Sequence, residues 1–127
     1  MIKKLTTNDI AQILTMNDPI DEIFPCDRGE WVQWLNQYID NPEIYMIGRS
    51  NNDRLISYAV AVNMVAPPLS NTIAIIFMSE LDKEFIETIK LWGREKSAQK
   101  IALSSKDMNA LKILDADEIS YVGAWVI

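Results

Sequence analysis

The sequence has no histidine and only one cysteine, Cys26. Without histidine there is no Ser-His-Asp or Cys-His nucleophile system and no histidine-ligated zinc site, and we expect no metal. A single cysteine cannot form an internal disulfide, so we expect a reducing, cytoplasmic setting. Any catalysis would have to rely on carboxylates, tyrosine, lysine, serine or backbone groups.

Positive charge and long apolar runs are also scarce. The chain has 12 Lys and Arg against 18 Asp and Glu, which gives a net charge of −6. An acidic surface repels phosphate backbones and anionic lipids, so we expect neither a nucleic acid nor a membrane as partner. No apolar run of the kind found in signal peptides follows the first residues. The longest apolar-rich stretch, residues 55–66, is too short to cross a bilayer.

What the sequence does contain is the composition of a globular domain. Hydrophobic residues make up 49% of the 127 positions, and there are only four glycines and five prolines. This balance excludes disordered and collagen-like chains. A chain of this length buries roughly two-thirds of the surface that its unfolded form exposes. We therefore predict a single domain over residues 1–127.

Two helices are predicted near the N-terminus, after a short strand at residues 3–5. Thr7 or Asn8 is suited to cap the first helix. Asp27, with Glu30 three residues later, has the spacing of a capping box and predicts the start of the second. Residues 20–25 between the helices are expected to form a loop. The inward-facing positions would be Ile10, Ile13 and Leu14 in the first helix, and Trp31, Trp34, Leu35, Tyr38 and Ile39 in the second.

Three adjacent strands are predicted in the middle of the chain. Residues 43–49 and 55–65 flank a turn signal at residues 50–53, so we expect a hairpin. Large and small side chains alternate along the second of these strands, which suits a sheet covered on both faces. Residues 72–78 are apolar almost throughout and predict a strand buried on both sides. The large face of the second strand would comprise Ile56, Tyr58, Val60, Val62 and Met64.

The remaining third predicts a helix, a strand, a helix and a strand. Ser79 or Asp82 is suited to start the first helix, whose inner face would comprise Leu81, Phe85, Ile89 and Trp92. A strand at 100–104, a helix at 107–115 and a strand at 119–127 follow. The predicted order is β-α-α-β-β-β-α-β-α-β, an α+β fold with a mixed sheet of about six strands and helices on both faces.

This order, over nearly the whole chain, resembles the GNAT superfamily of N-acetyltransferases. The opening IKKLTTNDIAQIL resembles the family's first strand and helix, and the strands within residues 43–78 resemble its second to fourth. The resemblance implies acetyl-CoA as cofactor, with its pantetheine arm along the fourth strand and its pyrophosphate on amides at the start of the next helix. The chain is also similar to small, motif-poor phage-encoded GNAT-like proteins. The implied cofactor contacts are Ile76, Phe77, Met78, Ser79, Leu81 and Lys83.

The residues that hold the pyrophosphate in that family are missing. The family pattern Gln/Arg-x-x-Gly-x-Gly/Ala falls on residues 78–84, and there is no glycine between Gly48 and Gly93. Glycine allows the backbone to approach the phosphates closely. Three carboxylates stand in this stretch, and each would oppose a bound phosphate by roughly 1 kcal/mol at partial exposure. These departures argue against acetyl-CoA binding.

Two residues are candidates for catalysis. Glu80 follows the central strand and is placed to act as a general base on an amine through water; a solvated carboxylate at a helix start is the alternative. The family's acid tyrosine aligns with Leu111 here. Tyr121, on the last predicted strand, is the candidate replacement acid, with a sheet aromatic as the alternative.

Two functional hypotheses remain open. The first is a non-catalytic GNAT-like module that binds a protein partner or a second copy through the last predicted strand, since the family usually closes with two strands and the sequence supplies one. The second is an active acetyl-CoA-dependent N-acetyltransferase that acts on a small primary amine by direct attack. Affinity for acetyl-CoA separates them.

Overall fold

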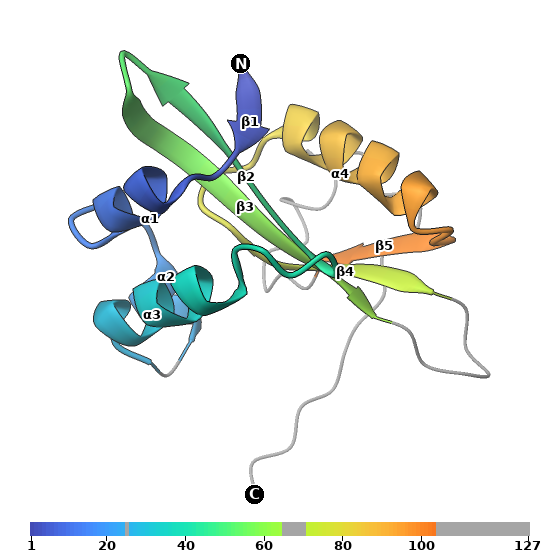
Figure 1. The fold of residues 1–127 in the computed structure, drawn as a ribbon, viewed down its shortest axis with the longest axis horizontal. Coiled ribbons are helices and arrows are strands. Elements are labelled where there is room, and N and C mark those ends of the chain that lie inside the picture. Colours follow the sequence, from blue (N-terminus) through green and yellow to red (C-terminus); the bar gives the residue numbers. More distant parts are fainter. Residues whose placement is uncertain (25, 65–70, 104–127) are drawn as a thin grey trace, which may run out of the picture.

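The structure is a computed structural model that describes residues 1–24, 26–64 and 71–103. Within these ranges five strands form one sheet in the order β1-β2-β3-β4-β5 (Figure 1). Neighbouring strands are antiparallel except β4 and β5, which are parallel. The strands are β1 (Ile2–Lys4), β2 (Ile44–Asn51), β3 (Arg54–Met64), β4 (Thr72–Met78) and β5 (Lys100–Leu103).

Helices cover both faces of this sheet, which confirms the predicted α+β class with a mixed sheet. The helices are α1 (Thr7–Ile13), α2 (Ile20–Ile23), α3 (Arg28–Tyr38) and α4 (Lys83–Glu95). Figure 1 shows α1, α2 and α3 on one face and α4 on the other. None of the described helices is long and apolar enough to span a membrane. The helix predicted at 107–115 and the strand predicted at 119–127, with Tyr121, lie outside the described residues.

The core is divided by the sheet into two clusters. The cluster under α1 and α3 includes Ile10, Ile13, Trp31, Leu35, Tyr58 and Phe77. The cluster under α4 includes Ile47, Ala59, Ala61, Ile73, Phe85 and Ile89. The small residues of β3 thus face α4 and the larger ones face α1 and α3, as the alternation along this strand predicted.

The start of α1 differs from the prediction. Thr6, rather than Thr7 or Asn8, is the N-cap, because Asp9 lies three residues beyond it and completes a capping box. The Thr6 hydroxyl accepts from the Asp9 N–H at 3.2 Å, and the Asp9 carboxylate accepts from the Thr6 N–H at 2.8 Å. Leu14 is 51% exposed, contrary to prediction, because α1 ends at Ile13 and Leu14 no longer faces the core.

The segment between the first two long helices was expected to be a loop, and this was wrong. Residues Ile20–Ile23 form the short helix α2. Asp18 accepts a hydrogen bond from the Ile20 N–H at 3.0 Å, which satisfies a backbone donor in the first turn. Ile20 is fully buried and anchors the turn to the core. A four-residue helix is not stable by itself, so the burial of Ile20 is what stabilises α2.

Helix α3 forms as predicted. The Asp27 carboxylate accepts from the Glu30 N–H at 2.8 Å, so Asp27 is the N-cap. Trp31 and Leu35 are buried, and Trp34 stacks on Trp31 with ring centroids 5.5 Å apart. The aromatic stripe is therefore core packing.

The predicted hairpin is confirmed, but β3 contains an irregularity that the sequence did not indicate. Arg49 lies opposite Ser57 and Ser50 opposite Leu55, so Ile56 is an extra residue in β3. Ile56 is 44% exposed, whereas the alternation had placed it beside Tyr58 in the core. Leu55 is buried there instead. One inserted residue reverses the face of every residue on its far side.

Candidate functional site at the end of β4

A second bulge lies at the end of β4. Val60 of β3 lies opposite Phe77 and Ala61 opposite Ile75, which makes Ile76 an extra residue. Ile75 therefore packs toward α4, while Phe77 packs toward α1 and α3. A bulged residue leaves the regular ladder, and its backbone groups become available to other partners.

The parallel pairing of β4 with β5 is described for the first part of β4. Among the described residues, β5 pairs with β4 from Thr72 to Ile75 only. Ile76, Phe77 and Met78 complete β4, with Phe77 buried and the other two half-buried. These are the three residues that the family resemblance assigned to the pantetheine arm.

Ser79 continues the pairing of β4 with β3. Its N–H donates to the Tyr58 carbonyl at 2.9 Å, and its Oγ accepts from the Tyr58 N–H at 2.9 Å. Both backbone groups of Tyr58 are satisfied in this way. The Ser79 amide, a candidate pyrophosphate donor in the sequence, is thus already bonded within the chain.

The N-terminus of α4 carries its own carboxylates. Asp82 is the N-cap, and its Oδ1 accepts from the Glu84 N–H at 2.9 Å. Arg49 of β2 places its Nη2 2.9 Å from Asp82 Oδ2 and 3.2 Å from Glu84 Oε2. The Asp82 carboxylate therefore lies at the positive end of the α4 dipole. The Arg49 guanidinium nearby already forms ion pairs with both Asp82 and Glu84.

The helix start leaves the two remaining predicted contacts exposed. Leu81 precedes the cap, so it lies outside α4 and is 52% exposed, contrary to its predicted place on the helix's inner face. Phe85, Ile89 and Trp92 are buried as predicted. Lys83 is the first residue of α4 and is also exposed. No glycine is needed in this loop, because none of its described residues has a positive φ.

A pocket of about 440 Å³ lies beside Ser79 and Glu80, two residues between β4 and the start of α4. Ser79 and Glu80, from the end of β4, form one wall. The segment after α1 and the start of β3 form the others. The lining residues are Gln12, Thr15, Met16, Asn17, Asp18, Arg54, Leu55, Ile56, Ser79 and Glu80. Glu80, the candidate base, is exposed and borders this pocket.

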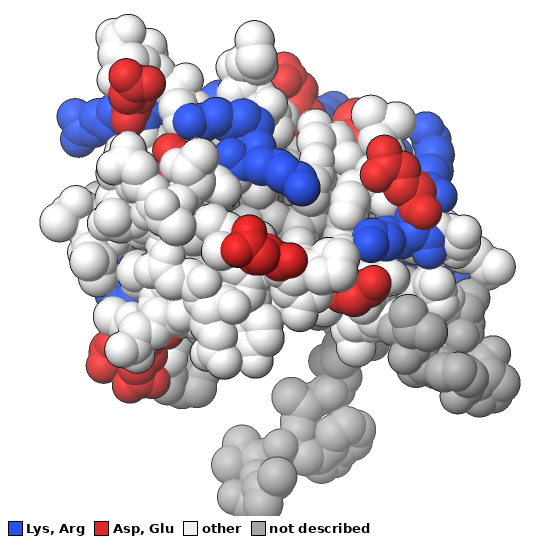
Figure 2. Space-filling view, viewed as in Figure 1, with Lys and Arg blue, Asp and Glu red and all other residues white. Residues whose placement is uncertain are grey.

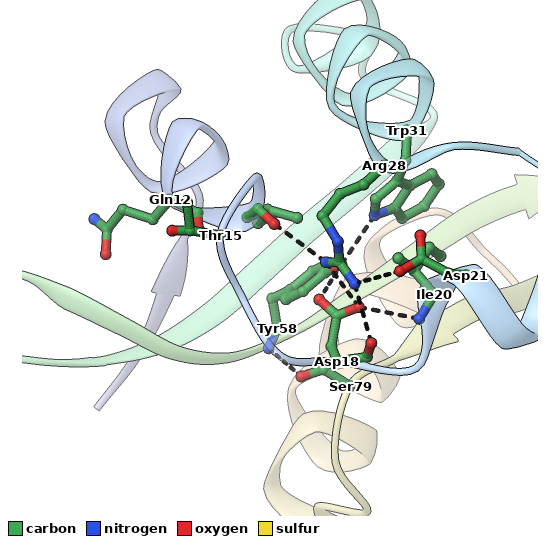
Figure 3. A network of polar contacts seen from close by, with 10 residues as sticks. Gln12, Thr15, Asp18, Ile20, Asp21, Arg28, Trp31, Tyr58 and Ser79 are labelled. Atoms are coloured by element: carbon green, nitrogen blue, oxygen red, sulfur yellow. Dashed lines mark hydrogen bonds and ion pairs between the residues drawn. The ribbon is translucent and has the colours of Figure 1, made fainter.

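A network of polar contacts includes Asp18 and Ser79, two residues that line the pocket (Figure 3). The Tyr58 hydroxyl donates to Asp18 Oδ2 at 3.0 Å and accepts from the Trp31 indole N–H at 2.9 Å. Arg28 Nη1 lies 3.1 Å from Asp18 Oδ1. Burial raises the pKa of Tyr58 far above its usual range, so the phenol keeps its proton at any ordinary pH. Asp18 is thus fully engaged inside the protein.

Sequence reasoning found Glu80 and Ser79 but missed the other polar groups of the pocket. Gln12 donates its amide to the Asp53 carbonyl and accepts from the Leu55 N–H, which joins α1 to the β2–β3 hairpin. Arg54 stands at the first position of β3. These contacts join residues about forty positions apart in the chain, and no local pattern indicates them. Among the described residues no group of acidic or cysteine side chains is placed to hold a metal ion.

Comparison with known proteins gives a fold but no sequence relative. No protein-family model matches the chain, and no curated protein matches it. Solved structures do. An aminoglycoside 6'-N-acetyltransferase from Acinetobacter haemolyticus has a TM-score of 0.77 at 12% identity, over 100% of this chain and 97% of that one.

Two further solved structures have the same fold. A GNAT family acetyltransferase from Staphylococcus aureus has a TM-score of 0.69 at 9% identity, over 100% of this chain and 96% of that one. A predicted acetyltransferase from Clostridium acetobutylicum, solved with acetyl-CoA, has a TM-score of 0.67 at 16% identity, over 97% and 95%. The chain has the fold of the GNAT acetyltransferases. The fold expectation from the sequence is confirmed.

Proposed function

We propose that this chain is a GNAT-fold binding module that acts through a protein partner and does not use acetyl-CoA. The observation that carries this proposal is the closed N-terminus of α4. Asp82 caps the Glu84 amide, and Arg49 holds the Asp82 carboxylate in place. A pyrophosphate at this helix would have to displace a carboxylate of the chain itself.

The local charge adds to this obstacle. Three acidic side chains, Glu80, Asp82 and Glu84, surround the start of α4, against Arg49 and Lys83. Arg49 is already shared by two of the carboxylates. Each carboxylate near a phosphate costs roughly 1 kcal/mol at partial exposure. The same stretch contains no glycine that would let the backbone approach more closely.

The partner would be a protein or a second copy of the chain. The sequence pattern of residues 119–127, with Tyr121, Val122, Trp125 and Val126, favours a strand, which we take as an edge strand. A strand edge of this kind pairs with an extended segment of another chain. On the face seen in Figure 2, acidic and basic side chains are interspersed and neither sign forms a continuous patch. A protein partner suits such a surface better than a polyanion.

A second candidate, acetyl transfer to a small primary amine, is favoured by the end of β4. The bulge at Ile76 takes this residue out of the regular ladder with β3, and its backbone groups would be available to a pantetheine arm. Glu80 borders the neighbouring pocket and would act as the base. Tyr121 would then be the acid.

Thiol release from acetyl-CoA tests the choice between the two. The purified chain is incubated with acetyl-CoA and a series of primary amines, and free CoA is measured. The binding-module proposal predicts release at the uncatalysed rate with every amine. Amine-dependent release that is abolished in Glu80→Gln would overturn it in favour of acetyl transfer.

A further inference from the structure

Two side chains of opposite charge border the 440 Å³ pocket, and the described chain leaves both without a partner. Arg54 enters from the start of β3 and Glu80 from the loop after β4. Both are exposed, and within the described residues neither makes a hydrogen bond or an ion pair, not even with the other. An arginine and a glutamate on one pocket that remain apart present two separate charged contacts to a ligand.

Three further polar side chains of the pocket are already engaged. Asp18 is held by Arg28 and by the Tyr58 hydroxyl. The Gln12 side chain donates to the Asp53 carbonyl and accepts from the Leu55 N–H. The Ser79 hydroxyl accepts from the backbone of Tyr58. A ligand in this pocket would therefore find its strongest unused contacts at Arg54 and Glu80.

The chemistry of these two groups defines the ligand. A guanidinium binds a carboxylate through two parallel hydrogen bonds, and a carboxylate binds an ammonium. The pocket volume lies in the range of small-molecule sites, roughly 300–1,000 Å³. Met16, Leu55 and Ile56 supply apolar wall between the polar groups. The arrangement suits a ligand with an apolar spacer between two charged ends.

We propose that this pocket binds a zwitterionic ligand, with its carboxylate on Arg54 and its ammonium on Glu80. The same chemistry is presented by a free amino acid and by a C-terminal lysine of a partner protein. The inference deepens the proposed binding function by naming the ligand class. It depends on neither the Asp82 cap nor acetyl-CoA, so it stands or fails separately from the closed helix terminus.

A series of ω-amino acids measures the separation of the two contacts. Glycine, β-alanine, 4-aminobutyrate and 6-aminohexanoate are titrated into the full chain, and binding is followed by amide chemical shifts. Butylamine and butyrate, each with one charge, are the controls. We expect one chain length to bind at least about tenfold more tightly than either control. Equal affinity for the controls, or no binding by any member of the series, would overturn the proposal.

Two variants assign the ends of the ligand. Arg54→Gln should lose about tenfold in affinity for the preferred amino acid while butylamine binding is unchanged. Glu80→Gln should lose the same factor while butyrate binding is unchanged. Lys90→Gln, an exposed change on α4 away from the pocket, is the control and should leave all affinities as they are. If neither pocket variant changes the affinity, the ligand binds elsewhere and the assignment is wrong.

Peptides distinguish the two sources of the ligand. A short peptide with a C-terminal lysine is compared with the same peptide carrying a C-terminal amide. Loss of binding on amidation assigns the pocket to a protein C-terminus. If the ω-amino acids bind and neither peptide does, the pocket is assigned to a free amino acid. Either result supports the zwitterion site, whereas equal binding of the acid and the amide contradicts the role of Arg54.

Discussion

The guanidinium of Arg49 lies 2.9 Å from the carboxylate of Asp82, which joins the middle of the sheet to the cap of α4. Arg49 also lies over the ring of Phe85, with its Cζ 5.9 Å from the ring centroid. The hydrogen bonds that Arg49 donates to Asp82 and Glu84 raise the pKa of its guanidinium further, so Arg49 keeps its positive charge. The relationship explains how a GNAT-type helix terminus can be stable without a phosphate.

Removing the carboxylates at the start of α4 should restore some affinity for acetyl-CoA. In the variant Glu80→Gln/Asp82→Asn/Glu84→Gln the cap is kept, because Asn caps a helix as well as Asp does. Relief of three repulsive charges corresponds to about 3 kcal/mol, or roughly a hundredfold in affinity. Calorimetric titration of the variant with acetyl-CoA measures this gain.

The matched control removes the same charge elsewhere. Asp40→Asn/Glu87→Gln/Glu95→Gln changes the net charge equally, with two of the three sites further along α4. Its affinity should equal that of the wild-type chain. A similar gain in both variants would show that overall charge, and not the start of α4, limits binding.

The hydroxyl of Tyr58 should be essential to the buried network. Tyr58→Phe leaves the Trp31 indole N–H and one Asp18 oxygen without their partner. An unsatisfied buried polar group costs about 1–3 kcal/mol, so urea unfolding should show a loss of that size. Tyr38→Phe is the control, since Tyr38 makes no described hydrogen bond through its hydroxyl. Equal stability of the two variants would contradict this account of the network.

The capping box of α1 predicts a specific pH dependence. Burial alone would raise the pKa of Asp9, but hydrogen bonds from Thr6 and the nearby Lys3 ammonium outweigh it and lower the pKa below its ordinary 3.8. The stabilisation is therefore complete above that value and is lost as pH falls through the lower folded-state pKa. Asp9→Asn should cost about 1 kcal/mol near neutrality, and its loss of stability on acidification should be smaller than that of the wild type. Urea unfolding of both chains over the acid range tests this, and parallel curves would argue against it.

Gly48 should tolerate no side chain. A Cβ there would lie 2.6 Å from Leu5 Cδ2, 2.8 Å from Leu55 Cδ1 and 3.1 Å from the Ser57 carbonyl. Gly48→Ala should therefore destabilise the β1–β2–β3 region by about 1–3 kcal/mol. At Gly29 the Cβ meets only the Asp27 carboxylate at 3.2 Å, and Gly29→Ala, in a helix, should be neutral or stabilising. Thermal unfolding compares the two, and a harmless Gly48→Ala would contradict the packing described here.

The sequence predicted the order of elements because each depends on local chemistry. The Asp27 cap, the aromatic face of α3 and the apolar strand at Thr72–Met78 are all visible in short windows. The two bulges are not. Ile56 and Ile76 look like ordinary strand residues, and only the pairing with a neighbouring strand identifies them as extra.

The site was predicted only in part for the same reason. Glu80 and the missing glycines could be read from the residues that follow β4. The role of Asp82 depends on Arg49, which is 33 positions away in the chain. Arg54 and Glu80 border the same pocket only because the fold brings the start of β3 near the residues that follow β4. Contacts made across the sheet leave no periodic or motif signal in a single sequence.

Calorimetric titration of the wild-type chain with acetyl-CoA tests the central claim most directly. The closed terminus of α4 predicts no measurable heat up to millimolar ligand, and no thermal shift. Binding at micromolar concentration, with the amide signals of Lys83 and Glu84 shifting in the same titration, would mean that the pyrophosphate displaces Asp82. That result would contradict the binding-module account and point to acetyl transfer.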